Sequence, residues 1–219
     1  MVSVQNKNGH LCGGFLVSED FVVTAAHCDM SVNQGLKHVI LGGHNWKNSN
    51  VKTIKISNQC KHKNYSDVVN GYDIMLLKVS IHLGNPEGLL IINAYGFELF
   101  LFLLAGPTCC SVAGWGRTER TYGPVDDLRV VNVSIIDHND CQQRWGGLPP
   151  NVICAVFHDV CSLQGDSSGP LVCNGKAVGI VSFNKGDNCK YPDMPNVYTD
   201  IREYVEWINN IITNKVCPM

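Results

Sequence analysis

Three short segments carry residue types that together can perform nucleophilic catalysis. They are TAAHC at 24–28, YDIMLL at 72–77 and QGDSSGPLVC at 164–173. In this order they offer a base (His27), a carboxylate (Asp73) and a nucleophile (Ser167). A serine hydroxyl is a poor nucleophile at neutral pH, so it needs a neighbouring base to take its proton, and histidine suits that role. A carboxylate on the far ring nitrogen fixes the tautomer and stabilises the imidazolium that forms.

The surroundings of Ser167 fit the same chemistry. Small residues beside the serine allow backbone N–H groups to face a developing oxyanion, and those of Gly165 and Ser167 are the candidates. Taken singly, each segment has an ordinary structural interpretation: a histidine beside a cysteine, a turn residue before a strand, a Gly-Asp-Ser loop. The three segments in this order favour nucleophilic catalysis, because they supply a nucleophile, a base and a carboxylate that orients the base.

Composition limits the class of protein. The 219 residues, 45% of them hydrophobic, are enough for one sizeable domain or for two small lobes that share an interface. Lys and Arg total 17, Asp and Glu total 19, and no run of like charges occurs, so we expect no nucleic-acid or anionic-membrane surface. A charged content of 16% excludes a disordered chain and a coiled coil.

The cysteines indicate a compartment. Eleven cysteines, without a Cys-x-x-Cys pair or a His-rich run, predict a disulfide framework in an oxidising environment and no metal site. The count is odd, so at least one thiol is left over. Asn-x-Ser sequons at Asn64 and Asn132 fit a secretory route. The chain nevertheless begins MVSVQNKNGH, without a basic-plus-apolar leader, so either its start is missing or the compartment interpretation is wrong.

Short strand-like runs separated by Gly, Asn and Pro dominate the chain and predict an all-β barrel or sandwich in two lobes. Examples are DFVVTAA (20–26), DIMLLKV (73–79) and KAVGIVSF (176–183). Near the end the hydrophobic spacing becomes helical and predicts a closing helix over about 200–213, with Asp200 and Glu203 as a capping box.

The segment LLIINAYGFELFLFLLA (89–105) fits this pattern poorly, because it is nearly all apolar without clean alternation. Three interpretations are open. One is a transmembrane helix, although the run is short and Asn93, Gly96 and Glu98 interrupt it. The others are a buried connection between the lobes and an error in a translated gene model.

The three catalytic segments and several further motifs resemble the chymotrypsin-fold (trypsin-like) serine proteases along nearly the full length of the chain. The further motifs are CGGFLV, SVAGWGRT, PNVYTDI and the terminal YVEWI. The resemblance implies His27 as base, Asp73 as orienting carboxylate, Ser167 as nucleophile, and Gly165 with Ser167 as oxyanion hole. It also implies that Ser182 in GIVSF lines the primary pocket.

Within the family, LGGHNW (41–46) together with CGGFLVSEDFVVTAAHC most resembles the granzymes and mast-cell granule proteases. This resemblance implies an extracellular or secretory-granule endopeptidase that works through an acyl-enzyme on protein or peptide substrates. It also implies protein protease inhibitors as partners and no metal or organic cofactor. We expect no nucleic-acid partner, no stable membrane insertion and a monomer.

The resemblance further implies two antiparallel β-barrel lobes, about 1–105 and 106–199, with the catalytic cleft between them and a C-terminal α-helix. It implies a set of disulfides as well. The pairs are Cys12–Cys28, Cys110–Cys173, Cys141–Cys154, Cys161–Cys189 and Cys60–Cys217, which leaves Cys109 over. The first pair would clamp the loop that carries His27, and Cys161–Cys189 would brace the walls of the specificity pocket.

The chain departs from the family at two positions near the expected site. Ser168 follows the nucleophile where the family has glycine, and its Cβ strains the elbow if that residue needs an unusual backbone conformation. Asn184 stands where glycine usually follows the aromatic residue of the pocket wall, so its side chain is expected to crowd the pocket entrance.

The floor of the pocket has two alternatives. Counting back six residues from Ser167 without gaps reaches Cys161, which gives a neutral floor with Asn196 on the wall. If the two residues after Cys161 are an insertion, Asp159 becomes the floor, and a buried carboxylate there selects Lys or Arg. The second register is preferred because it explains both Cys161 and Cys189.

In the resembling proteases, a freed α-amino group pairs with the aspartate before the nucleophile, here Asp166. The strand that begins at Met1 resembles one inside the mature domain, so the mature amino terminus, propeptide and signal are expected to be missing. The chain as written is then expected to be folded but zymogen-like, with a formed triad and little turnover. Restoring the mature amino terminus is expected to raise the activity at least about tenfold. The alternative is a non-enzymatic binding homologue of the same fold.

Overall fold

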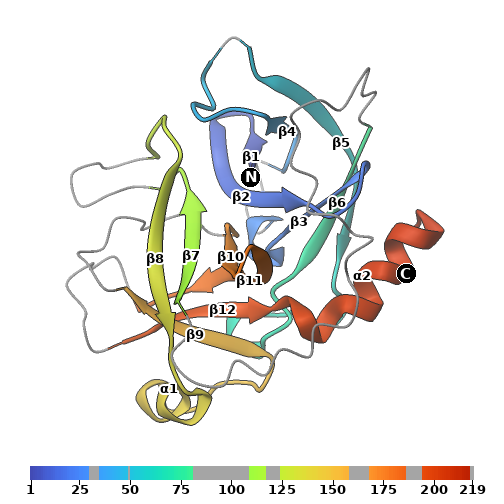
Figure 1. Ribbon diagram of the computed structural model, residues 1–219. Coiled ribbons are helices and arrows are strands. Elements are labelled where there is room, and N and C mark those ends of the chain that lie inside the picture. Colours follow the sequence, from blue (N-terminus) through green and yellow to red (C-terminus); the bar gives the residue numbers. More distant parts are fainter. Residues whose placement is uncertain are drawn as a thin grey trace.

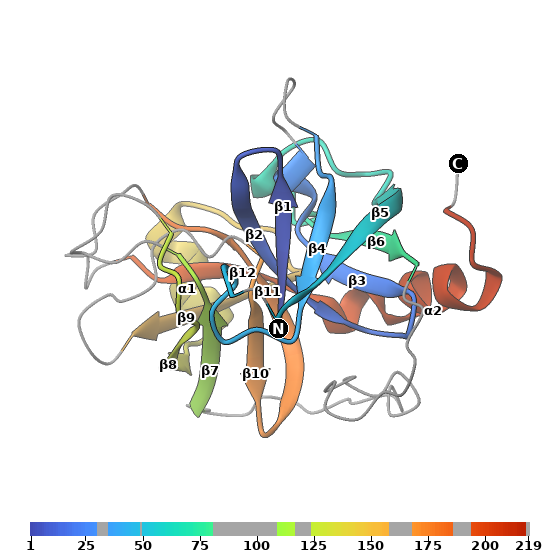
Figure 2. The ribbon, with the colours of Figure 1, turned by 90° about the horizontal axis from the view of Figure 1, so that it is seen from above.

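The computed structural model describes residues 1–29, 35–48, 50–80, 109–116, 124–157, 168–185 and 194–217. Within these residues the strands form two closed antiparallel barrels, β1–β6 and β7–β12, followed by a C-terminal helix (Figures 1 and 2). The predicted all-β fold of two barrel lobes with a closing helix is therefore confirmed. The expected lobe boundary near residue 105 and the apolar segment 89–105 lie outside the described residues.

The first barrel follows the order β1-β2-β3-β6-β5-β4. Its strands are β1 (Val2–Asn6), β2 (Gly9–Leu16), β3 (Phe21–Thr24), β4 (His38–Leu41), β5 (Lys52–Lys61) and β6 (Met75–Val79). On β5, buried Ile54, Ile56 and Cys60 are separated by exposed polar residues, as a strand with one solvated face requires. Two 3₁₀ turns follow β3 and β5, namely η1 (Ala26–Asp29) and η2 (Val68–Asn70).

The second barrel follows the order β10-β11-β12-β9-β8-β7. Its strands are β7 (Cys109–Gly114), β8 (Arg129–Ile135), β9 (Val152–Phe157), β10 (Pro170–Cys173), β11 (Lys176–Phe183) and β12 (Asn196–Asp200). A short helix, α1 (His138–Trp145), lies between β8 and β9. The Asp137 carboxylate accepts hydrogen bonds from the N–H groups of Asn139 and Asp140 and so caps this helix.

The closing helix begins later than the sequence predicts. A 3₁₀ turn, η4 (Ile201–Tyr204), precedes α2 (Val205–Asn214). The Asp200 carboxylate accepts hydrogen bonds from the N–H and the guanidinium of Arg202, so Asp200 caps the 3₁₀ turn rather than forming the expected box with Glu203. Buried Ile208 and Ile211 place α2 against the core of the first barrel.

The two barrels are joined through the segment that contains the His-Asn-Trp motif. The carbonyl of His44 accepts hydrogen bonds from Trp115 Nε1 at 2.9 Å and from the N–H of Leu128 at 2.8 Å. Trp46 Nε1 donates to the carbonyl of Val125 at 3.0 Å. The motif that the sequence analysis associated with granule proteases therefore has a structural role at the junction of the lobes.

His10 lies beside this junction and gives a testable dependence of stability on pH. Its ring lies 6.0 Å from that of Trp46 and 5.6 Å from that of Trp115, and Nδ1 is 2.8 Å from Ser3 Oγ. Burial lowers the pKa of His10 to about 4 from an ordinary 6.5. The unfolded chain therefore binds more protons than the folded chain between these values, and stability falls as the pH drops from 6.5 to 4.

Between pH 6.5 and pH 4 the unaltered protein loses unfolding free energy because of His10. We expect His10→Gln to make this loss smaller by up to about 3 kcal/mol. The measurement is urea denaturation at a series of pH values. His44→Gln is the matched control, because the His44 side chain is 72% exposed. An unchanged slope in His10→Gln, or an equal change in the control, would contradict the prediction.

Four disulfides join cysteines that the structure describes, and all four belong to the set that the resemblance implies. They are Cys12–Cys28, Cys60–Cys217, Cys110–Cys173 and Cys141–Cys154. Cys60–Cys217 ties the end of the chain to β5 of the first barrel. The expected Cys161–Cys189 pair lies outside the described residues, as does the side chain of Cys109.

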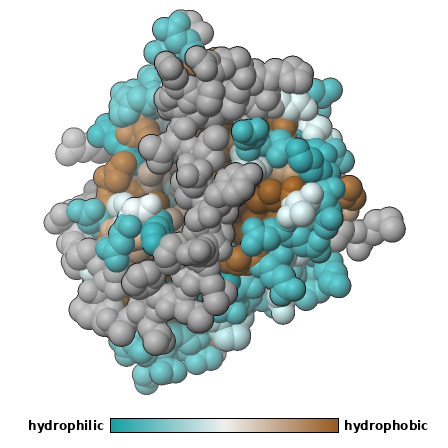
Figure 3. Space-filling view, turned by 45° about the vertical axis from the view of Figure 1, so that its right-hand side comes forward, coloured by the Kyte–Doolittle hydropathy of each residue, from teal (hydrophilic) through white to brown (hydrophobic). Residues whose placement is uncertain are grey.

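The surface of the described residues is mainly hydrophilic on the face in Figure 3, where apolar side chains gather in limited areas. In the part of the chain that the structure describes, no helix combines the length and the apolar character needed to cross a bilayer.

Candidate active site

His27 and Asp73 are brought together by two elements of the first barrel. His27 lies on η1, directly after β3, and Asp73 lies two residues before the first residue of β6. β3 and β6 are paired antiparallel, with Thr24 opposite Met75, so the residues just beyond this pair approach each other. The Cys12–Cys28 disulfide ties η1 to β2.

The contact between the two side chains has the geometry of an oriented base. His27 Nδ1 lies 2.7 Å from Asp73 Oδ2, and the N–H of His27 donates to Asp73 Oδ1 at 2.9 Å. Asp73 is fully buried, whereas the His27 side chain retains 17% of its exposure. Because Nδ1 is engaged by the carboxylate, Nε2 is the ring nitrogen left to exchange a proton with a nucleophile.

The second barrel completes the surroundings of Asp73. Ser182 on β11 donates its hydroxyl hydrogen to Asp73 Oδ2 at 2.5 Å, and Thr199 on β12 donates to the Asp73 carbonyl at 3.0 Å. Ser182 is the residue that the family resemblance places in the primary pocket, whereas Thr199 was not among the expected site residues. The site therefore lies where the two barrels meet.

Opposing effects act on the Asp73 carboxyl. Burial raises its pKa, but hydrogen bonds and charge attraction from His27, together with the hydrogen bond from Ser182, lower it by more. The net result is a pKa below the ordinary value. Asp73 is therefore ionised at neutral pH and able to stabilise a protonated His27.

The loop that leads to Asp73 is held from outside the first barrel. Asn151, just before β9, donates from Nδ2 to the Gly71 carbonyl at 2.7 Å, and the Tyr204 hydroxyl donates to the same carbonyl. Gly71 has a φ of 78°, and a Cβ there would come within 2.1 Å of Asn151 Oδ1. Only glycine fits this close approach.

The predicted nucleophile and its immediate neighbours lie outside the described residues. These are Asp159, Cys161, Gly165, Asp166 and Ser167. Of the other predicted pocket residues, Asn184 is exposed just after β11, and Asn196 is half-buried opposite Ala155. The structure thus brings together His27, Asp73 and Ser182, and leaves the remaining assignments as predictions.

Ser168 follows the predicted nucleophile and was expected to be strained if its backbone adopts an unusual conformation. The structure shows that it does. It is fully buried, with a φ of 80°, and its N–H donates to the Val181 carbonyl at 2.8 Å. Its hydroxyl oxygen lies 2.8 Å from Cys28 Sγ. A positive φ is unfavourable for a residue with a Cβ, so the usual glycine suits this position better.

We therefore expect Ser168→Gly to increase the free energy of unfolding by about 1 kcal/mol, because glycine removes the cost of the left-handed conformation. Ser168→Ala is the matched control: it removes the hydroxyl but keeps the Cβ, so it should bring no such gain. Chemical denaturation at neutral pH measures both. A glycine variant no more stable than the alanine variant would contradict this account.

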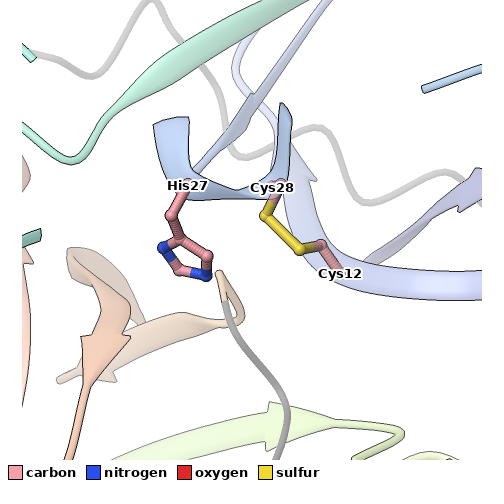
Figure 4. A group of neighbouring side chains, drawn as sticks. All are labelled: Cys12, His27 and Cys28. Carbon is pink, nitrogen blue, oxygen red and sulfur yellow. A yellow bond between two sulfur atoms is a disulfide. The ribbon is translucent and has the colours of Figure 1, made fainter. Parts of the chain in front are cut away.

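The side chains of Cys12, His27 and Cys28 form the one cluster of metal-ligand types found among the described residues, with ligand atoms within 4.8 Å of one another (Figure 4). Figure 4 shows, however, that the two sulfur atoms are joined in a disulfide beside the imidazole. A cysteine binds a metal ion as a thiolate, and a disulfide has none. With this disulfide intact, the cluster does not fit a metal ion.

Comparison with known families matches residues 1–208 to the family described as Trypsin. The chain is 35% identical over 218 residues to trypsin-1 of Salmo salar, which covers 95% of this chain and 84% of that protein. It is 37% identical over 207 residues to duodenase-1 of Bos taurus, covering 92% and 78%. It is similar in structure to mouse neuropsin, a serine protease, with a TM-score of 0.79, 29% identity and coverage of 96% and 93%.

The fold and the His27–Asp73 site define a chymotrypsin-like serine protease scaffold. This chain belongs to the trypsin family of serine proteases.

Proposed function

We propose that this protein is a serine endopeptidase that hydrolyses peptide bonds through an acyl-enzyme. The proposal is carried by one observation: in a chain of the trypsin family, His27 Nδ1 lies 2.7 Å from a buried, ionised Asp73. Ser167 attacks the substrate carbonyl carbon while His27 Nε2 takes the hydroxyl proton. His27 then gives that proton to the leaving amine, and water hydrolyses the acyl-enzyme by the reverse transfers.

The N–H groups of Gly165 and Ser167 are proposed to stabilise the tetrahedral oxyanion. Asp166 is proposed to position these donors by pairing with an α-amino group, as the family resemblance implies. The test is turnover of peptide amides by the mature protein. Pre-steady-state release of the leaving group ahead of steady turnover supports an acyl-enzyme, and absence of hydrolysis from every peptide in a diverse library would refute the proposal.

A second candidate is a non-enzymatic binding homologue. The observation in its favour is the strained, buried Ser168 beside the predicted nucleophile. The contacts around Asp73 favour the enzyme, since Ser182 donates to the carboxylate that contacts His27 and Thr199 donates to the backbone carbonyl of the same residue. The turnover measurement separates the two candidates.

Secretion is the compartment that we propose. Four disulfides between described residues are typical of an oxidising environment. One relative, 34% identical over 236 residues, is a venom plasminogen activator from Trimeresurus stejnegeri. Storage in granules follows only from the resemblance of LGGHNW to granule proteases. Protein substrates and protein protease inhibitors are the proposed partners of a monomer.

Specificity provides a further prediction. If Asp159 is the floor of the primary pocket, peptides should be cleaved best after Lys or Arg, and Asp159→Ala should remove that preference. The loss should be at least about 100-fold in kcat/KM for Arg over Leu peptides, because a buried carboxylate that pairs with a cation is removed. Preferred cleavage after Leu, Phe or Met by the unaltered protein would support Cys161 as the floor instead.

A further inference from the structure

We propose that Asn64 carries an N-linked glycan that borders the candidate active site and restricts access by large substrates. The inference rests on the proposed secretion of the protein. Asn64, Tyr65 and Ser66 form one of the two Asn-x-Ser sequons, and no proline interrupts it. Asn64 and Ser66 are exposed, whereas Tyr65 between them is half-buried.

The sequon lies on a surface turn after β5. The N–H of Tyr65 donates to the His62 carbonyl at 3.0 Å, and the N–H of Asn64 lies 3.3 Å from His62 Nδ1. The side-chain amide of Asn64 makes no hydrogen bond to any residue that the structure describes. An exposed turn is where a bulky hydrophilic glycan is accommodated without disturbing the core.

The start of this turn and the last residue of β5 contact residues close in the chain to Asp73 and to His27. The N–H of His62 donates to the carbonyl of Ile74, the residue after Asp73, at 3.2 Å. Lys61 Nζ lies 2.9 Å from Asp29 Oδ2, and Asp29 ends the 3₁₀ turn that carries His27. A group attached two residues after His62 therefore stands at the edge of the candidate site.

The electrostatic environment of Tyr65 agrees with this placement of the turn. Burial raises the pKa of Tyr65 to about 12, and the negative charges of Asp73 and Asp67 contribute to the increase. The Tyr65 ring also lies 5.9 Å from Lys61 Nζ. The side chain between the two sequon residues is thus within electrostatic reach of the buried carboxylate of the site.

The modification needs an oligosaccharide donor linked through a diphosphate to a lipid, as the secretory pathway supplies. The bond between the first sugar carbon and the diphosphate oxygen breaks, and that oxygen keeps the electron pair. A bond forms between the sugar carbon and Asn64 Nδ2, which loses one proton. Transfer to the chain before folding means that the hydrogen bond from Asn70 to the Ser66 hydroxyl in the folded protein is no obstacle.

The consequence is size selection. A glycan at the edge of the site occupies volume that a folded protein substrate must enter, whereas a short peptide reaches His27 without it. The glycan should therefore lower kcat/KM for folded substrates and leave kcat/KM for short peptides nearly unchanged.

The experiment uses the full protein secreted from eukaryotic cells, with Asn132→Gln in every sample so that one sequon remains. Peptide mass mapping after enzymatic deglycosylation in ¹⁸O water identifies Asn64 if it carried a glycan. Asn64→Gln and Ser66→Ala should both abolish the modification, whereas Ser66→Thr retains the sequon and should keep it. An unmodified Asn64 in the secreted protein overturns the proposal.

The kinetic arm compares a folded protein substrate with a short peptide. Loss of the glycan by either route should raise kcat/KM for the folded substrate about three- to tenfold, with Ser66→Thr unchanged. Equal values with and without the glycan overturn the restriction of access. The mass mapping does not depend on activity, so a glycosylated but inactive protein would count against the proposed hydrolysis and in favour of this modification site.

Discussion

Replacing Asp73 with asparagine is expected to lower kcat by about 10⁴-fold while leaving the protein folded. The amide has nearly the shape of the carboxylate, and its oxygen in the Oδ1 position can still accept the hydrogen bond from the His27 N–H. The NH₂ group then takes the Oδ2 position, which faces His27 Nδ1 and the Ser182 hydroxyl. The amide carries no charge, so it does not stabilise the imidazolium, and its NH₂ group favours the wrong tautomer of His27. The measurement is kcat on a peptide amide at saturating concentration.

Asp67→Asn provides the matched control for this prediction. Asp67 is an exposed carboxylate on the loop that leads to Asp73, and it caps η2 by accepting a hydrogen bond from the N–H of Val69. Asparagine keeps that capping bond, so kcat should stay within about twofold of the unaltered value. A loss of less than about tenfold in Asp73→Asn would contradict the role given to Asp73.

Ser167→Ala should produce the largest loss of all, about 10⁶-fold in kcat, because the covalent route then has no nucleophile. KM for peptides should change little, since the groups that bind the substrate are untouched. Ser168→Ala should retain most of the activity. Ser168 is the only other hydroxyl in the Gly-Asp-Ser-Ser-Gly segment, but its side chain is fully buried and directed at Cys28 Sγ.

Some of the structural features behind these predictions can be predicted from the sequence, and others cannot. The barrels follow from short β-rich runs, because alternation and turn residues are local signals. The four observed disulfides agree with the set that the family resemblance implies. The helix α1 went unpredicted, although Asp137 before it and Gly146 after it, with a φ of 74°, are ordinary start and stop signals.

The contacts that support Asp73 were less accessible from sequence. Ser182 and Thr199 lie more than a hundred positions away in the chain, and only the packing of one barrel on the other brings them to the carboxylate and the backbone carbonyl of Asp73. Asn151 and Tyr204 meet at the Gly71 carbonyl for the same reason. Sequence patterns report the period of each element, but not the register in which two closed barrels dock.

Ser168, in contrast, could be recognised from the sequence as unusual. The substitution of serine for the family's glycine was visible in the sequence, and its cost depended on one backbone angle. The φ of 80° supplies that angle. A strained residue next to the proposed nucleophile is therefore a feature of this chain rather than of the family, and it makes Ser167 reactivity the decisive property to measure.

Labelling with a fluorophosphonate probe, followed by mass mapping of the modified peptide, measures that property directly. We expect one phosphonylated residue, Ser167, with labelling lost in Ser167→Ala, strongly slowed in Asp73→Asn and retained in Ser168→Ala. A mature, folded protein that takes up no probe, or that takes it up at Ser168, would contradict the assignment of His27, Asp73 and Ser167 as the catalytic residues.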